Sequence, residues 1–504
     1  MTGHESKHGS STTVNLSLIS HTNAGKTTLA RTLLGRDIGE VRDAAHVTDL
    51  SSGHVLVQSG EDTLMLWDTP GFGDTARLLS RLRMSGNPIG WFLSQVWDRW
   101  RERPLWSSQQ AIKNAREQAD VILYLVNAAE DPAAASYVAL EMEVLAWIGK
   151  PVVVLLNQMG PPREDVSNEI ARWSGIGAAG QVRATLPLDA FARCWVQEIA
   201  LLDIVTPLLP PAKARAMAVL TARWGELNHT RFDSCMAVLA GYLHRAARDR
   251  ETVEEANWQG KVAGAIGGRS KGDRAARKAM GLLATRLAES TAKSTDELIQ
   301  LHGLSGKAAR KVLERVSDDY AHQAKTPEGA TAALGGLVSG AVGGLAADLA
   351  AGGLTLGGGM IVGAILGALS GTGLAKGFNL ARGEDSSIVR WSGALLERLT
   401  VTALLRYLAV AHFGRGRGEW AEGEHPPFWQ SVVADAVAER KSDLARVLKA
   451  PVIEGGADSG RAQDLSGLLN EMGRTILERL YPDARPACLT ASRQQKRPPG
   501  LQAG

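Results

Sequence analysis

The chain has 504 residues, enough for about three domains of roughly 150 residues each. Its 22% charged and 44% apolar residues are typical of a globular protein, and a net charge of +3 is too small to indicate nucleic-acid binding by itself. Three widely spaced cysteines without paired histidines exclude a disulfide framework and a zinc site, and they suit a reducing cytosol.

The first part of the chain has the pattern of an α/β domain. Residues 1–12 form a polar arm, which we expect to be disordered and which lacks the apolar core of a secretory signal. From residue 13 to residue 209, short apolar runs alternate with helical stretches, which predicts a doubly wound, mostly parallel sheet. The expected strands are residues 14–19, 54–58, 64–67, 121–126 and 152–156.

The first expected strand leads into the string SHTNAGKT at residues 20–27, and a helix is expected to follow. The string matches the phosphate-loop pattern GxxxxGK[ST], except that Ser20 replaces the first glycine. Backbone N–H groups of such a loop surround phosphates, and the helix dipole adds to the attraction. We expect Lys26 to reach the β- and γ-phosphates and Thr27 to bind Mg²⁺. The nucleotide-binding residues predicted here are Asn23, Ala24, Gly25, Lys26, Thr27 and Thr28.

A second motif follows the strand at residues 64–67. Asp68-Thr-Pro-Gly71 supplies a carboxylate for the Mg²⁺ shell and a glycine amide that can sense the γ-phosphate. Its spacing from the phosphate loop favours this interpretation over an ordinary strand with a Pro-Gly turn. Phe72 stands where Ras-like enzymes carry a water-orienting glutamine, so we expect slow intrinsic hydrolysis.

Together, the two motifs resemble the G-x-x-N-x-G-K-[ST] and D-T-P-G-[LF] segments of TrmE-Era-type P-loop GTPases, over residues 13–205. The resemblance implies GTP and GDP as ligands and Mg²⁺ as cofactor. It also implies a threonine that contacts Mg²⁺ and the γ-phosphate. Thr48 is the best match for it, and Ser51 is the alternative. Asn23 matches the asparagine that holds K⁺ in potassium-dependent members, which implies K⁺-stimulated hydrolysis.

The guanine-reading motif of that family, Asn-Lys-x-Asp, is only partly present. Asn157 follows the strand at residues 152–156 as expected, but Gln158 replaces the lysine and Gly160 replaces the aspartate. Loss of that carboxylate removes a discrimination against adenine on the order of 1–3 kcal/mol. Guanine preference therefore rests on the resemblance, and the choice between guanine and adenine stays open.

Residues 74–116 form a tryptophan-rich insertion between the second motif and the next strand. Helical spacing predicts that Leu93, Val96, Trp97 and Trp100 share one face. We favour packing of this face on the protein's own helical domain, with a membrane interface or a partner groove as the alternative. Because the insertion is joined to the Asp68–Gly71 motif, nucleotide state can move it in either case.

Residues 210–327, which lack strand signals, and residues 381–480, which read as charged amphipathic helix, predict an all-α domain, followed by a disordered tail at residues 481–504. Residues 328–380 between them predict a glycine-rich apolar helical hairpin. From residue 329 to residue 375 the only charge is Asp348, and the stretches 331–351 and 354–375 each approach the ~20 residues that span a bilayer. Lys325, Lys376 and Arg382 flank the hairpin, which fits entry and exit on the cytoplasmic side. The alternative is a hairpin buried in the helical domain, or one that inserts only in some states.

The layout resembles a group of bacterial GTPases whose C-terminal helical domain has no assigned role. We predict a cytoplasmic, inner-membrane-associated, Mg²⁺-dependent GTPase that couples nucleotide state to the helical region. Catalytic roles fall to Lys26, Thr48, Gly71 and Asn23, and Thr27, Thr48 and Asp68 are the metal ligands. The alternatives are a ribosome-assembly GTPase, for which no RNA-binding module is visible in the sequence, and a structural or pore-forming membrane protein with a nucleotide switch. Homodimer formation, partner and pathway stay open.

Overall fold

The computed structural model describes residues 11–35, 51–83, 86–95, 100–159, 166–177, 180–190, 193–254, 271–304, 378–382, 386–413, 426–449 and 458–482. The chain divides into two compact units. The first comprises residues 1–229, 412–418 and 481–504, and the second comprises residues 230–411 and 419–480.

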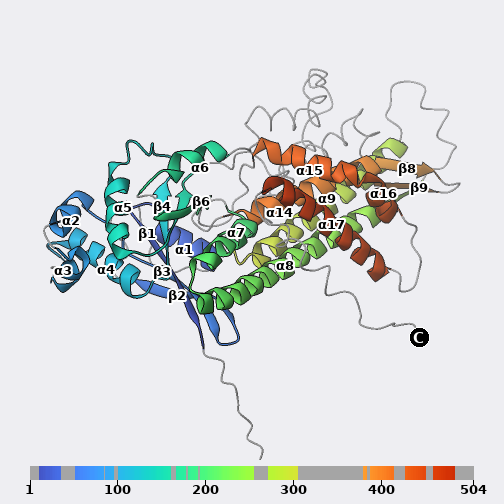
Figure 1. The fold of residues 1–504 in the computed structure, drawn as a ribbon. Helices are drawn as coiled ribbons and strands as arrows, with labels where there is room; N and C mark the ends of the chain where they lie inside the picture. The colour runs from blue at the N-terminus through green and yellow to red at the C-terminus, as the bar shows by residue number, and fades with distance from the viewer. Residues whose placement is uncertain are drawn as a thin grey trace, which may run out of the picture. The chain divides into compact units, whose positions relative to one another are not determined.

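A six-stranded sheet forms the centre of the first unit (Figure 1). The strands lie in the order β2-β3-β1-β4-β5-β6. β2 runs antiparallel to β3, and the other neighbouring pairs are parallel. The strands are β1 (Thr13–Ser20), β2 (Ser52–Ser59), β3 (Asp62–Asp68), β4 (Val121–Asn127), β5 (Val152–Asn157) and β6 (Val182–Pro187). The predicted mostly parallel α/β fold is confirmed.

The central strands are apolar throughout because both faces of the sheet are covered. Alternate residues of β4 enter two different cores: Ile122, Tyr124 and Val126 on one face, and Val121, Leu123 and Leu125 on the other. The first core is completed by helices α2 (Thr75–Leu82), α3 (Pro88–Ser94), α4 (Arg103–Glu117), α5 (Ser136–Ile148) and α6 (Ser167–Ser174). The second is completed by α1 (Lys26–Leu34), α7 (Trp195–Val205) and the start of α8 (Pro211–Arg248).

The first unit continues beyond the predicted boundary at residue 209. A short 3₁₀ turn, η1 (Thr206–Leu208), leads into α8. The first turns of α8 belong to the packing of the sheet, since Met217 and Leu220 lie in the second core. Lys213 of α8 also forms an ion pair of 2.7 Å with Asp120, at the start of β4.

The insertion between β3 and β4 does not contain the single tryptophan-bearing helix that spacing predicts. α3 begins after Asn87, whose side chain caps it, and ends at Ser94, and Gln95 is extended. The Gln109 amide of α4 donates to the carbonyl oxygens of Phe92 and Gln95 at 2.9 Å and 2.8 Å, which holds the chain in this break. The prediction of one shared face was therefore wrong. Trp100 is 80% exposed, and residues 96–99 lie outside the described residues.

The second unit is mainly helical, as predicted. Among the described residues, its helices are the remainder of α8, α9 (Lys271–Leu301), α14 (Gly393–Ala411), α15 (Pro427–Glu439), α16 (Lys441–Lys449) and α17 (Asp458–Leu480). It also contains a small antiparallel sheet, β7-β9-β8, that the sequence did not predict. β7 (Arg250–Glu254) is an edge strand rich in charged residues, β8 is Phe378–Arg382 and β9 is Ser386–Trp391.

The glycine-rich segment at residues 329–375 lies outside the described residues, so the predicted hairpin stays a prediction. Within the described part of the chain, no helix combines the length and the apolar character needed to cross a membrane.

Candidate nucleotide-binding site

The loop between β1 and α1 has the backbone of an anion-binding turn. Asn23 and Gly25 have positive φ angles of 67° and 90°. Left-handed residues of this kind are typical of turns whose successive N–H groups form an anion-binding concavity. A Cβ atom at Gly25 would lie 2.6 Å from Asn157 Nδ2, so this position requires glycine for both conformation and space. Ser20, which replaces the first glycine of the motif, is the last residue of β1 and needs no positive φ.

Lys26 turns back across this loop. Its side chain is buried, and its Nζ donates to Ser20 Oγ at 2.9 Å and to the carbonyl oxygen of His21 at 3.5 Å. Burial lowers the pKa of Lys26 to about 8, and the charges of Asp68 and Glu141 oppose this shift. The amine therefore lies in a dry position, where an added negative charge would be strongly attracted.

Asp68 and Thr27 meet next to the loop. The Thr27 hydroxyl donates to Asp68 Oδ2 at 2.6 Å, and Asp68 Oδ1 is buried without a hydrogen-bond partner among the described residues. Burial raises the pKa of Asp68, while the bond from Thr27 lowers it. A buried carboxylate oxygen beside a hydroxyl is an all-oxygen donor set, which fits Mg²⁺. No group of three or more His, Cys, Asp or Glu side chains that could hold a metal occurs in the described residues.

The segment after Asp68 lies directly on the phosphate loop. A Cβ atom at Gly71 would lie 2.8 Å from Thr22 Cα and 3.1 Å from Lys26 Nζ. The Phe72 backbone N–H donates to the Ser20 carbonyl at 2.9 Å, and the Thr22 N–H donates to the Phe72 carbonyl at 3.1 Å. The Phe72 ring is fully buried in the first core, so it does not face the loop.

Asn157 connects the phosphate loop to the segment after β6. Its Nδ2 donates to the Ala24 carbonyl at 2.7 Å, and its Oδ1 accepts from the Ala190 N–H at 2.8 Å. In the turn after Asn157, the Met159 N–H donates to the buried carboxylate of Asp189 at 2.7 Å. Asn157 therefore fixes two loops at the same edge of the sheet.

Two family models match the chain. A model described as a domain of unknown function, DUF3482, matches residues 178–456, more than half of the 504 residues. The chain belongs to the DUF3482 family. A second model, described as a 50S ribosome-binding GTPase, matches residues 15–158. This DUF3482 protein thus has an N-terminal P-loop GTPase domain, as the sequence predicted. No curated protein matches the chain.

Solved structures with some similarity to the DUF3482 protein include GTPases. A variant of Aquifex aeolicus Era bound to GDP·AlF₄⁻ is 16% identical, over 54% of this chain and 89% of that chain, with a TM-score of 0.29. Era with MgGDPNP and part of 16S ribosomal RNA is 17% identical, over 58% and 89%, with a TM-score of 0.29. GMPPNP-bound NFeoB from S. thermophilus is 13% identical, over 60% and 89%, with a TM-score of 0.23. Scores of this size transfer no property of those proteins to the DUF3482 protein.

The structure brings most of the predicted site residues of the DUF3482 protein together. Lys26, Thr27, Asp68, Gly71 and Asn157 all lie within one or two contacts of the loop at residues 20–27. The remaining predicted residues are Gly25 and the exposed Asn23 of the loop, the buried Thr28 in the first turn of α1, and Ala24. The carbonyl oxygen of Ala24 accepts from Asn157. Their roles towards a nucleotide stay predictions.

Thr48 is the predicted Mg²⁺ ligand, and Gly160 stands at the position of the base-reading aspartate. Thr48 and Gly160 lie outside the described residues. Ser51, the alternative to Thr48, is described just before β2, and its hydroxyl donates to the Gln110 carbonyl of α4 at 3.4 Å.

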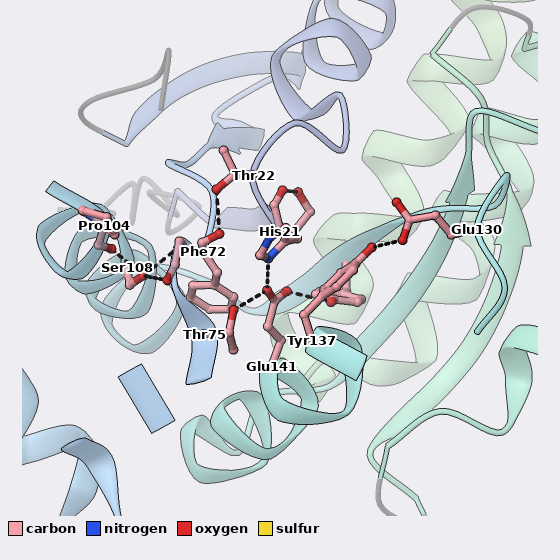
Figure 2. Close-up of polar contacts among 12 residues, drawn as sticks. His21, Thr22, Phe72, Thr75, Pro104, Ser108, Glu130, Tyr137 and Glu141 are labelled. Carbon is pink, nitrogen blue, oxygen red and sulfur yellow. Dashed lines mark hydrogen bonds and ion pairs between the residues drawn. The ribbon is translucent and has the colours of Figure 1, made fainter. Parts of the chain in front are cut away.

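Sequence reasoning missed three contributors to the site. Asp189 and Ala190 follow β6, a strand with partly exposed residues and no continuous apolar run, so nothing drew attention to its end. Glu141 is buried in α5 and bonds to His21 of the phosphate loop (Figure 2). A signal for it existed, because Glu141 shares the apolar face of that helix with Val138 and Leu145.

Proposed function

We propose that the DUF3482 protein binds GTP with Mg²⁺ and hydrolyses it to GDP and phosphate. The observation that carries this proposal is the convergence of a buried lysine, a threonine–aspartate pair and the Gly71 segment on one anion-binding loop. These groups meet where a strand ends and a helix begins, as a triphosphate site requires.

The residues have distinct tasks in this reaction. A water oxygen attacks the γ-phosphorus, the bond to the β–γ bridging oxygen breaks, and the water proton leaves with the phosphate. Lys26 and the loop amides stabilise the charge that develops on the phosphate oxygens, and the Gly71 amide holds the γ-phosphate. Thr27 and Asp68, with Thr48, would hold Mg²⁺, which would supply positive charge to offset the negative charge of the triphosphate. Because the Phe72 side chain is buried, it cannot orient the water, so we expect slow turnover.

Measurement of phosphate release by the full chain tests this function. We expect Mg²⁺-dependent release from GTP, lost on addition of EDTA, and weaker release from ATP. The guanine preference rests on the GTPase domain match, since Gly160 stands where a base-reading aspartate is usual. Release from ATP alone would contradict the GTPase proposal, and release from neither nucleotide would contradict hydrolysis.

Asn23 supports a finer proposal, that K⁺ stimulates the reaction. The residue has a left-handed backbone and an exposed side chain in the phosphate loop. A cation held there would add positive charge beside the phosphates, as an arginine does in other GTPases. Turnover in KCl is expected to exceed turnover in NaCl, and Asn23→Ala should remove the difference. Equal rates in the two salts would end the proposal.

We also propose that nucleotide state is coupled to a membrane-associated region. Its support is the composition of residues 329–375, with one charge and two stretches of near-spanning length. After carbonate extraction, the full chain should stay in the membrane fraction, and a variant lacking residues 329–375 should not. Complete release of the full chain would contradict stable insertion.

The description of the matching GTPase model favours the ribosome as the alternative partner. Co-sedimentation with ribosomal subunits tests it, with GMPPNP and GDP compared. Binding that requires GMPPNP would favour this alternative, and absence of co-sedimentation in both states would exclude it.

A further inference from the structure

Glu141 is a fully buried carboxylate in the middle of α5, and it accepts three side-chain hydrogen bonds. Its Oε1 contacts His21 Nδ1 at 2.7 Å and accepts from the Thr75 hydroxyl at 2.9 Å. Its Oε2 accepts from the Tyr124 hydroxyl at 2.7 Å. Figure 2 shows His21 and Thr75 converging on the carboxylate. A buried carboxylate needs such bonds, because each missing donor leaves desolvated charge uncompensated.

The neighbouring groups keep these donors in place. Burial and then the charge of Glu141 raise the pKa of Tyr124 well above its usual value, so its hydroxyl stays protonated and donates. The ring of His21 lies against the ring of Tyr137, with 4.3 Å between centroids. The Tyr137 hydroxyl is held in turn by Glu130 at 2.8 Å (Figure 2). His21 therefore has one defined orientation, with Nδ1 on the carboxylate.

The three donors come from segments with different tasks. His21 belongs to the phosphate loop, Thr75 is the first residue of α2, and Tyr124 lies in the central strand β4. One carboxylate oxygen thus joins the phosphate loop to the end of the segment that begins at Asp68. Movement of either segment would leave that oxygen with one donor fewer.

The same segment is also held at earlier points: the Thr69 hydroxyl donates to the Leu18 carbonyl of β1, and the Gly73 N–H donates to Ser108 Oγ of α4 at 3.3 Å. Two further contacts reach the phosphate loop itself. Asp68 at its start accepts from Thr27, and Phe72 in its middle bonds to Thr22 through its carbonyl. Those contacts are made directly with the phosphate loop. The contact of Thr75 is different, because it reaches the loop only through the buried carboxylate on α5. The carboxylate therefore fixes the far end of the segment.

We propose that Glu141 is a positioning residue of the GTPase site, which holds residues 69–75 against the phosphate loop and so sets the rate of hydrolysis. This inference rests on the function proposed above. Gly71 lies in that segment, next to Lys26 Nζ, where its amide would meet the γ-phosphate. GDP has no γ-phosphate, so loosening the segment should slow turnover and leave GDP affinity unchanged. A displacement of about 1 Å is enough to cost a factor of up to about 100 in rate.

Thr75→Val in the full chain is the sharpest test, because valine keeps the shape of threonine and removes one donor to Glu141. We expect kcat for GTP to fall about tenfold or more, with the Kd for GDP within about twofold of wild type. Thr75→Ser restores the hydroxyl and should return kcat close to the wild-type value. If Thr75 served only to fill space, loss of its methyl group in Thr75→Ser would lower kcat as much as loss of its hydroxyl in Thr75→Val.

A substitution of Glu141 itself provides a second test. Glu141→Gln keeps the size of the side chain but replaces the carboxylate acceptor, and it should reproduce the loss of kcat. Glu143→Gln is the matched control, two residues away and paired only with Arg83 at the surface among the described residues. Exposed pairs of this kind contribute little, so its kcat should equal that of wild type.

The proposal is overturned if folded Thr75→Val and Glu141→Gln turn over GTP at the wild-type rate, or if Thr75→Ser is as slow as Thr75→Val. Failure of the proposed function itself gives a different result, which is the absence of turnover by wild type. In that case, hydrogen exchange of the nucleotide-free protein still decides the positioning role. Faster exchange over residues 71–78 in Thr75→Val, but not in Thr75→Ser, supports it, and identical exchange in all three proteins contradicts it.

Discussion

At the scale of single residues, the buried amine of Lys26 controls how nucleotide binding should depend on pH. Its pKa is about 8 in the nucleotide-free protein because burial disfavours the charged form. A phosphate beside the amine favours the charged form and raises that pKa. From about pH 8 up to the raised pKa, the bound state carries more protons than the free state, so binding takes up a proton in that range.

The affinity for GDP is therefore expected to fall as pH rises through about 8, by up to about tenfold per pH unit above it. Isothermal titration in two buffers of different ionisation enthalpy measures both the Kd and the proton uptake. An affinity that stays constant from about pH 7 to about pH 9 would show that the charge of this lysine does not respond to the nucleotide.

Asn157 is the residue on which the shape of the site's two loops depends. Asn157→Ala removes both bonds of the side chain and leaves the Ala24 carbonyl and the Ala190 N–H buried without it. We expect a loss of about 2 kcal/mol in the free energy of unfolding, with weaker binding of every nucleoside diphosphate. Urea unfolding and GDP titration measure the two effects.

Asn127 is the matched control for that substitution, because it pairs with Asn157 in the register of β4 and β5 and ends its strand at the same edge of the sheet. Its side chain bonds locally, to Glu130 and to the Ala129 N–H. Asn127→Ala should leave GDP affinity unchanged. Equal effects of the two substitutions would contradict a special role for Asn157.

At the scale of elements, the segment that contains Gly71 lies in close contact with the phosphate loop, and an added side chain should disturb this contact. Gly71→Ala places a methyl group 2.8 Å from a backbone atom of Thr22, which cannot move aside without disturbing the loop. We expect turnover to fall by more than about tenfold, since the segment must lift off the loop. Gly86→Ala is the control, because nothing lies within 4 Å of its added Cβ. Wild-type turnover by Gly71→Ala would contradict the contact.

The sequence predicted those elements whose pattern is local. β4 and β5 read as continuous apolar runs, and the phosphate loop reads as a contiguous string between a strand and a helix. β6 and β7 have no such pattern, because β6 is partly exposed and β7 is a charged edge strand. The break between α3 and α4 depends on the Gln109 side chain reaching the end of α3, which no periodicity reveals.

The candidate site divides in the same way. Lys26, Thr27, Asp68 and Gly71 were predictable because their spacing follows from the chemistry of a triphosphate. Glu141 and Asp189 were not predicted, because each acts through a partner more than 25 residues away along the chain. The apolar face of α5 marks Glu141 as buried, but the partners of both residues are set by the packing of α5 and by the end of β6, so these contacts become visible only in the fold.

At the scale of the whole molecule, a P-loop GTPase domain is joined to a region of the DUF3482 family that is helical with a small antiparallel sheet. The proposed membrane association depends on residues 329–375, for which composition is the only guide. The catalytic proposal does not depend on these residues.

If Lys26 and its loop bind the phosphates of a nucleotide, titration of labelled GDP and ADP into the full chain shows it most directly. We predict saturable binding of GDP that is tighter than that of ADP, and a loss of about 100-fold or more in affinity for Lys26→Ala, on the order of 3 kcal/mol. Unchanged affinity of Lys26→Ala for both nucleotides would contradict this role of Lys26.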